Sequence, residues 1–170
     1  MQKLKIALLS YRSAPFSGGQ GIFVRELSKA LTKRGHMVDV ISGPPMPTLD
    51  SGIGLIKLEG LNLFETFNFK DRVKKLWNKK NKNRLDYYDF FTTLIGGFPE
   101  MYSFGERAKE YLLKGKDYDI ILDNQSLSLG MLEIQKKYPF IEIIHHPITK
   151  DFKYDLIYSN GIIQRFFKKR

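Results

Sequence analysis

The sequence predicts an α/β domain in which a Rossmann-like, doubly wound and mainly parallel sheet carries helices on both faces. Short apolar runs alternate along the chain with segments of helical periodicity, which is the pattern of successive βαβ units. One of these runs, YDIIL at Tyr118–Leu122, is continuous in the way of a strand covered on both faces. With 170 residues and 42% hydrophobic content, the chain can fill one core but is too short for two ordinary domains.

The first βαβ unit occupies the N-terminal quarter of the chain. A strand at Leu4–Leu9 ends at Ser10, and a glycine cluster follows it. The next segment is helical, because its apolar residues recur on one face: Phe23, Leu27, Ala30 and Leu31. Gly35 stops this helix, and the β-branched run from Met37 predicts a second strand.

A third short strand is expected at Ile53–Leu58, after a loop rich in proline and glycine. The middle of the chain is less regular. Leu61–Phe69 is aromatic without a clean period, Lys70–Asn83 predicts a basic helix, and Asp89–Ile95 leads into the loop GGFPE.

The second half returns to alternation. Helices are expected at Ser103–Leu113 and Ser126–Tyr138, and strands at Tyr118–Leu122 and Phe140–Ile144. In such a sheet the ligand lies beyond the carboxyl ends of the parallel strands.

The composition excludes several classes of protein. There is no cysteine, so neither a disulfide framework nor a thiolate metal site is possible, which agrees with a cytoplasmic protein. No apolar run approaches the roughly 20 residues of a membrane-spanning helix, and the N-terminal run is too short for a secretory signal.

The net charge of +10 is concentrated in two segments, Lys70–Arg84 and Arg165–Arg170. A near-neutral body with two basic segments favours a local contact with phosphate groups or anionic lipid. It does not favour a protein coated for nucleic acid.

Three polar clusters follow predicted strand ends. The first contains Gly18, Gly19, Gln20 and Gly21. Backbone N–H groups at the start of a helix can hold a phosphate, although a tight turn that needs glycine explains the cluster equally well. Its spacing is not the G-x-G-x-x-G fingerprint, so a nicotinamide cofactor is not supported.

The second cluster contains Asp123, Asn124 and Gln125. These side chains could orient a sugar hydroxyl or hold an imidazole, but Asp-Asn at a strand end is also ordinary turn chemistry.

The third cluster is the pair His145 and His146, followed by Pro147. Adjacent residues of an extended chain point to opposite faces, which makes the pair a poor chelate, so no metal is expected. One imidazole should face the cleft while the other packs or caps.

The basic segment has a separate candidate role. Phe69, Val73, Leu76 and Trp77 form one apolar stripe with lysines around it, as in a helix that lies at a membrane interface. The membrane-facing candidates are Lys74, Lys75, Trp77, Lys79 and Lys80. A packed helix with a solvated face is an equally good reading.

Four stretches together resemble the N-terminal, acceptor-side domain of family 4 glycosyltransferases of the GT-B fold. They run in family order over nearly the whole chain: Ala14–Pro47, Gly96–Ala108, Asp123–Gly130 and Ile143–Phe152.

The resemblance implies transfer of a sugar from a nucleotide-sugar donor to a glycan or lipid acceptor, with retention of configuration and without metal or cofactor. It places the glycine loop near the diphosphate and acceptor, and a histidine, better matched by His145 than by His146, beside the reacting sugar. In this family a C-terminal domain holds most nucleotide-sugar contacts, so residues 1–170 are expected to be half of a catalytic unit and inactive alone.

The expected function is therefore the acceptor domain of a glycosyltransferase of glycoconjugate or glycolipid synthesis, cytoplasmic and possibly peripheral at the inner face of the membrane. The alternative is a non-catalytic module that binds anionic membrane or a polyanion through its basic segments.

Overall fold

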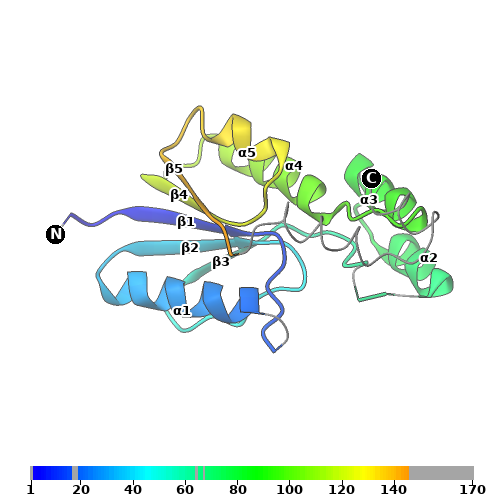
Figure 1. Ribbon diagram of the computed structural model, residues 1–170, viewed down its shortest axis with the longest axis horizontal. Coiled ribbons are helices and arrows are strands. Elements are labelled where there is room, and N and C mark those ends of the chain that lie inside the picture. Colours follow the sequence, from blue (N-terminus) through cyan, green and yellow to red (C-terminus); the bar gives the residue numbers. More distant parts are fainter. Residues whose placement is uncertain (1, 17–18, 64, 67, 146–170) are drawn as a thin grey trace, which may run out of the picture.

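A sheet of five parallel strands forms the centre of the molecule (Figure 1). The computed structural model describes residues 2–16, 19–63, 65–66 and 68–145. The strands are β1 (Lys5–Ser10), β2 (Met37–Ser42), β3 (Gly54–Lys57), β4 (Ile120–Asn124) and β5 (Phe140–Ile143), in the order β3-β2-β1-β4-β5. All four pairings are parallel, which confirms the predicted class. The strand order reverses between β1 and β4, the switch point at which such sheets bind ligands.

Helices cover both faces of the sheet, because side chains alternate along each strand. Ile6 and Leu8 of β1 pack toward α1 (Gly19–Lys33) with Val24. Ala7 and Leu9 face the opposite side, which is covered by α4 (Glu100–Leu113) and α5 (Leu129–Ile134). The doubly wound arrangement is thus present.

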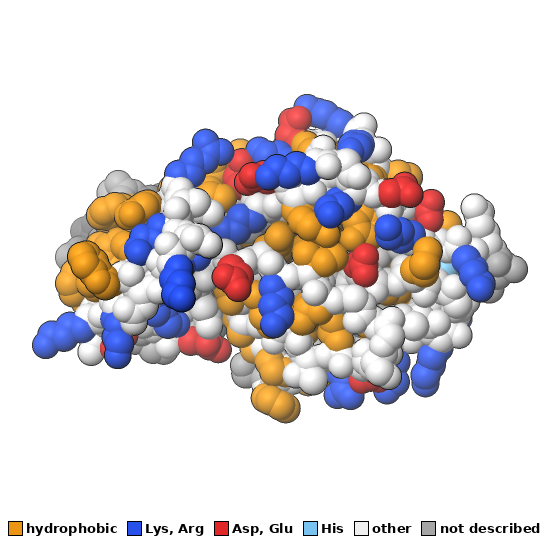
Figure 2. All heavy atoms as spheres, turned by 180° about the vertical axis from the view of Figure 1, so that it is seen from behind, with side chains coloured by type: hydrophobic (Ala, Val, Ile, Leu, Met, Phe, Trp, Pro, Cys, Tyr) orange, Lys and Arg blue, Asp and Glu red, His pale blue; other side chains and the backbone are white. Residues whose placement is uncertain are grey.

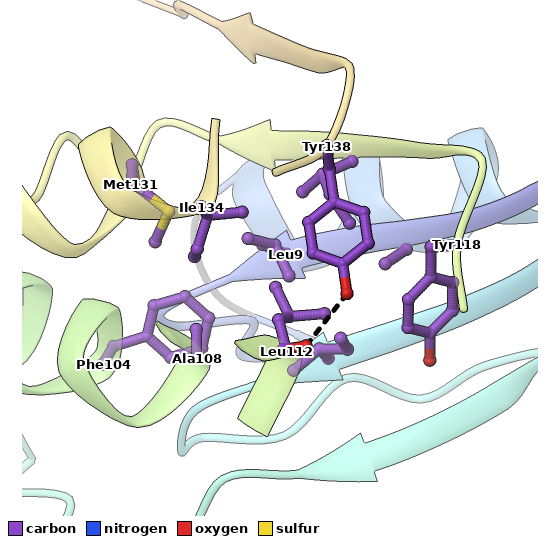
Figure 3. Packing of buried hydrophobic residues seen from close by; sticks show 11 residues of the cluster. Leu9, Phe104, Ala108, Leu112, Tyr118, Met131, Ile134 and Tyr138 are labelled. Carbon is purple, nitrogen blue, oxygen red and sulfur yellow. Dashed lines mark hydrogen bonds between the residues drawn. The ribbon is translucent and has the colours of Figure 1, made fainter. Parts of the chain in front are cut away.

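The core under α4 and α5 combines aliphatic and aromatic side chains (Figure 3). Leu112 and Ile134 are fully buried between the helices and the sheet. Tyr138 is also buried, and its hydroxyl donates to the Leu112 carbonyl at 2.9 Å. The last turn of α4 therefore gains a hydrogen bond that its own helix cannot supply.

Two further helices, α2 (Phe69–Asn78) and α3 (Arg84–Leu94), lie beyond the carboxyl edge of the sheet (Figure 1). The prediction of one helix over Lys70–Asn83 is wrong at its C-terminal end. Asn83 begins α3 instead: its side chain accepts from the backbone of Leu85 and Asp86, and the Asp86 carboxylate accepts from the Asn83 N–H. This capping box starts a new helix where the sequence pattern suggested the old one continued.

The predicted helix Ser126–Tyr138 is also too long. Gln125 and Leu127 have φ of 57° and 46°, so the chain turns sharply before α5 begins at Leu129. Conversely, Asp123 and Asn124 belong to β4 itself and do not follow it. No helix among the described residues is long and apolar enough to cross a membrane.

Candidate functional site

A chain of hydrogen bonds joins the ends of β1, β4 and β5 at the switch point. The Ser13 hydroxyl donates to Ser10 Oγ at 2.7 Å, and Asn124 Nδ2 donates to the same oxygen at 3.4 Å. Asn124 Oδ1 lies 2.6 Å from His145 Nε2. Since the Asn124 amide nitrogen faces Ser10, its oxygen faces the histidine and accepts the proton of Nε2.

His145 is held from two further directions. Its backbone N–H donates to Gln125 Oε1 at 3.0 Å. Its ring meets the Phe23 ring of α1 edge to face, with centroids 4.7 Å apart. The imidazole is therefore fixed in tautomer and orientation while the residue stays exposed, and Nδ1 has no partner among the described residues.

The three residues predicted to shape an acceptor pocket are buried and do not lie on one surface. Asn124 lies on the α1 face of the sheet with Ser10, whereas alternation puts Asp123 on the α4–α5 face with Ile121. Asp123 Oδ2 accepts from the Ser126 N–H at 2.7 Å, which stabilises the turn after β4. Asn124 and Gln125 are the two that contact His145.

A second carboxyl lies beside Asp123, and sequence reasoning missed it. Glu142 of β5 is the register partner of Asp123. Burial and the neighbouring Asp123 carboxylate raise the pKa of Glu142 to about 8, and burial also raises the pKa of Asp123. The pair therefore retains a proton at neutral pH. The sequence does contain a signal for this carboxyl, because Glu142 is an acidic residue within the otherwise apolar run FIEI.

The glycines of the loop after β1 have different surroundings. A Cβ on Gly21 would lie 2.1 Å from the Ala14 carbonyl oxygen, so close packing of the loop against α1 requires glycine there. Among the described residues, no heavy atom lies within 4 Å of a Cβ placed on Gly19. Gln20 is half-buried. Gly18 and His146 lie outside the described residues.

The predicted membrane-facing residues divide into two groups. Lys75 Nζ donates to the Asn62 carbonyl at 2.5 Å, and Lys79 Nζ donates to Asp86 at 2.5 Å and to the Glu59 carbonyl at 3.2 Å. These two lysines hold α2 to the rest of the molecule. Lys74, Lys80 and Trp77 are exposed, Trp77 to 80%.

Within the part of the chain that the structure describes, no three His, Cys, Asp or Glu side chains gather as a metal site would require. His36 accepts a hydrogen bond from the Leu4 N–H through Nδ1 at 3.2 Å, which is a structural role.

Comparison with known proteins identifies the family. The sequence profile of Glycosyltransferase Family 4 matches residues 17–170. The chain belongs to glycosyltransferase family 4. A curated relative, the MMP alpha-(1->4)-mannosyltransferase of Mycolicibacterium hassiacum, is 40% identical over 151 residues, which are 87% of this chain and 36% of the relative. The chain thus spans about a third of that protein's length.

Among solved structures, CalG4, the calicheamicin glycosyltransferase, aligns with 94% of this chain and 38% of its own, at 12% identity and a TM-score of 0.49. The strand order and the parallel strand registers of this chain establish its fold.

Proposed function

We propose that this chain is the N-terminal, acceptor-side domain of a retaining glycosyltransferase that takes a nucleotide sugar as donor and needs neither metal nor cofactor. Family membership supports sugar transfer, and the 40% identity to a protein named a mannosyltransferase supports a hexosyl group. The observation that carries the proposal is His145, exposed and fixed by Asn124 at the switch point. Fixed donors and acceptors of this kind are what a reacting sugar requires.

In this proposal His145 lies beside the reacting sugar, and its Nδ1, the ring nitrogen that does not bind Asn124, accepts a hydrogen bond from a sugar hydroxyl. Asn124 and Gln125 position His145 and do not touch the substrate. Asp123 stabilises the turn behind them, and His146 serves the conformation of the following loop.

The start of α1 would receive the donor phosphates. This helix has 15 residues and no acidic residue in its first turn, so its N–H groups and dipole favour an anion. The open space at Gly19 leaves room for a close approach. A second domain, in the same polypeptide or another, would supply the remaining donor contacts.

The first test is an activity assay with a panel of nucleotide sugars. This chain alone should show no transfer, because a GT-B site forms only between two domains, whereas the chain joined to a donor-binding domain should transfer a sugar. Turnover by the chain alone would overturn the half-enzyme part of the proposal.

The second test uses the adjacent histidines as a matched pair in the joined enzyme. His145→Ala should lower kcat by about 10²-fold, the effect of losing one positioned hydrogen bond in a transition state, while the fold persists. His146→Ala should lose far less activity and show its effect first in thermal stability. Equal losses of kcat in the two variants would contradict the placement of His145, and not His146, beside the reacting sugar.

A second candidate function, compatible with the first, is attachment to anionic membrane. Trp77 and Phe69 of α2 are 80% and 59% exposed, and basic and apolar side chains mingle on the end of the molecule formed by α2 and α3 (Figure 2, left). Such a surface suits an interface with anionic headgroups, and a lipid acceptor would place the enzyme there.

Trp77 is the single tryptophan of the chain, so its fluorescence reports docking directly. Vesicles containing phosphatidylglycerol should shift its emission to the blue at low salt, and the charge reversals Lys74→Glu and Lys80→Glu should remove the shift. An unchanged spectrum with wild-type protein would remove the membrane hypothesis.

A further inference from the structure

A narrow slot opens at the carboxyl edge of the sheet. It is lined by residues that follow β1, β2 and β3 and by one side of α3 and α4, among them Tyr11, Asn62, Asp89, Glu100 and Arg107. Its volume is about 20 Å³, enough for one or two hydroxyl groups or water molecules and too small for a whole sugar ring.

Three residues of this slot have buried polar atoms without a hydrogen-bond partner among the described residues: Asn62 Oδ1, Asp89 Oδ1 and Arg107 Nε. The side chains of Asp89 and Arg107 are only 7% and 9% exposed. Buried polar atoms are nearly always paired in folded proteins. Two of these atoms accept and one donates, so a hydroxyl group, which does both, suits the slot.

The charges around the slot are already arranged in pairs. Arg107 bridges Asp86 at 3.0 Å and Asp89 at 3.2 Å, and Lys79 also binds Asp86. Arg72, which lies near Glu100, donates to the carbonyls of Thr66 and Thr93. These cations are therefore committed to groups of the protein.

Glu100 differs from Asp86 and Asp89, which both have a cation as partner. It forms no ion pair among the described residues, although Arg12 and Arg72 lie close enough to lower its pKa. Burial outweighs them and raises the pKa of Glu100, as it raises that of Asp89. A ligand hydroxyl that donates to Glu100 would relieve this cost, whereas a phosphate would meet two carboxylates.

The slot and the site at the switch point both lie at the carboxyl edge of the sheet. Tyr11, which lines it, directly follows Ser10, the residue that accepts a hydrogen bond from Asn124. A molecule anchored in the slot would thus extend along the same edge of the sheet toward His145.

We infer that the slot binds hydroxyl groups of an uncharged, sugar-like acceptor through Asn62, Glu100 and Arg107, and selects it over a phosphorylated one. This inference rests on the proposed function, since it names the class of acceptor for that site.

The experiment titrates the ¹⁵N-labelled 170-residue chain with the methyl α-D-glycosides of glucose, mannose and galactose, and with the matching sugar 1-phosphates. At least one neutral glycoside should shift the backbone amides of residues 60–63 and 100–107. Glu100→Ala should weaken that binding about tenfold, which is the order expected when a hydrogen bond to a charged group is lost.

Two variants sharpen the result. Glu100→Gln should narrow the preference for the glycoside over the phosphate, because it removes the repelling charge. Glu106→Ala is the matched control on the same helix: its carboxylate pairs with Lys109 and does not line the slot, so binding should be unchanged.

The inference would be overturned by amide shifts elsewhere in the chain, by no shifts with any glycoside, or by equal binding of the sugar phosphates. Water alone would then pair with the buried polar atoms of the slot. The proposed function is tested separately, by sugar transfer in the joined enzyme. Transfer without glycoside binding in the slot refutes only the inference, whereas absence of transfer with every nucleotide sugar refutes the function.

Discussion

The sheet with α1, α4 and α5 and the helix pair α2–α3 are held together by different interactions. In the first region apolar side chains from both faces of β1, β2 and β4 are buried in two clusters, and partly buried side chains of β3 and β5 pack against them. The pair α2–α3 rests on a cluster of three buried residues, Leu61, Leu63 and Phe90, with Leu76 packed against it. Buried charges supply much of its remaining attachment. Burial of apolar side chains thus fixes the sheet, whereas the helix pair beyond its carboxyl edge depends on a few specific polar contacts.

The largest expected difference is in local stability. No residue of α2 is buried, and few apolar contacts would be lost if it opened, so its amides should exchange with solvent by local unfolding. The amides of β1 and β4, which lie at the centre of the sheet, should exchange only on global unfolding. Native-state hydrogen exchange should show rates that differ by orders of magnitude, and similar protection in both regions would contradict the comparison.

The next effect concerns the ion cluster that joins the two regions. Arg107→Ala should lower the free energy of unfolding by about 3–5 kcal/mol, because Asp89 is left buried without a cation and Asp86 retains only Lys79. Chemical denaturation monitored by circular dichroism measures this loss.

Lys109→Ala is the control for that variant. Lys109 lies on the same helix, α4, and pairs with Glu106 at the surface, so its removal should cost about 1 kcal/mol or less. A loss at Arg107 no larger than at Lys109 would mean that the buried charges do not hold α2 and α3 in place.

The same contrast explains what the sequence could predict. Hydrophobic periodicity predicts the fold class, the five strands and the long helices α1 and α4. Burial on both faces of a sheet requires apolar residues at regular spacing in its strands and in the helices that cover it. Capping at Asn83 and the positive φ of Gln125 and Leu127 are local backbone features without such a period, so the ends of α2 and α5 were misjudged.

The candidate site was predicted only in part. Strand-end reasoning brought Asn124 and His145 to one edge, where they are now seen in contact. The ion cluster of Asp86, Asp89 and Arg107 joins two helices that are separate in sequence, and no spacing rule links them. Asp123 was grouped with Asn124 by adjacency, although alternation within a strand sends the two side chains to opposite faces.

A smaller effect is expected within the glycine loop. Gly21→Ala should destabilise the fold by about 1–3 kcal/mol, the usual range for overpacking, because its Cβ would lie 2.1 Å from backbone oxygen of Ala14. Gly19→Ala has open space and should leave the thermal midpoint nearly unchanged. Equal destabilisation by both would show that the loop is uniformly packed and has no open face.

The last effect is a difference between pH values, and it concerns the neighbouring carboxyl groups of Asp123 and Glu142 in the sheet. The folded-state pKa of Glu142, about 8, lies above its ordinary value of 4.5, so folding takes up a proton between these two pH values. By linkage, the contribution of this group to stability is fully present below about pH 4.5 and is lost as the pH rises through 8. Glu142→Gln keeps the side chain neutral, and its thermal midpoint should therefore rise relative to wild type as the pH increases from 5 to 9. Glu133→Gln on α5 is the control, since Lys136 lowers the pKa of that exposed carboxylate and no such gain can appear. A difference between Glu142→Gln and wild type that stays constant across this pH range would mean that Glu142 takes up no proton on folding, and that the pair does not retain a proton at neutral pH.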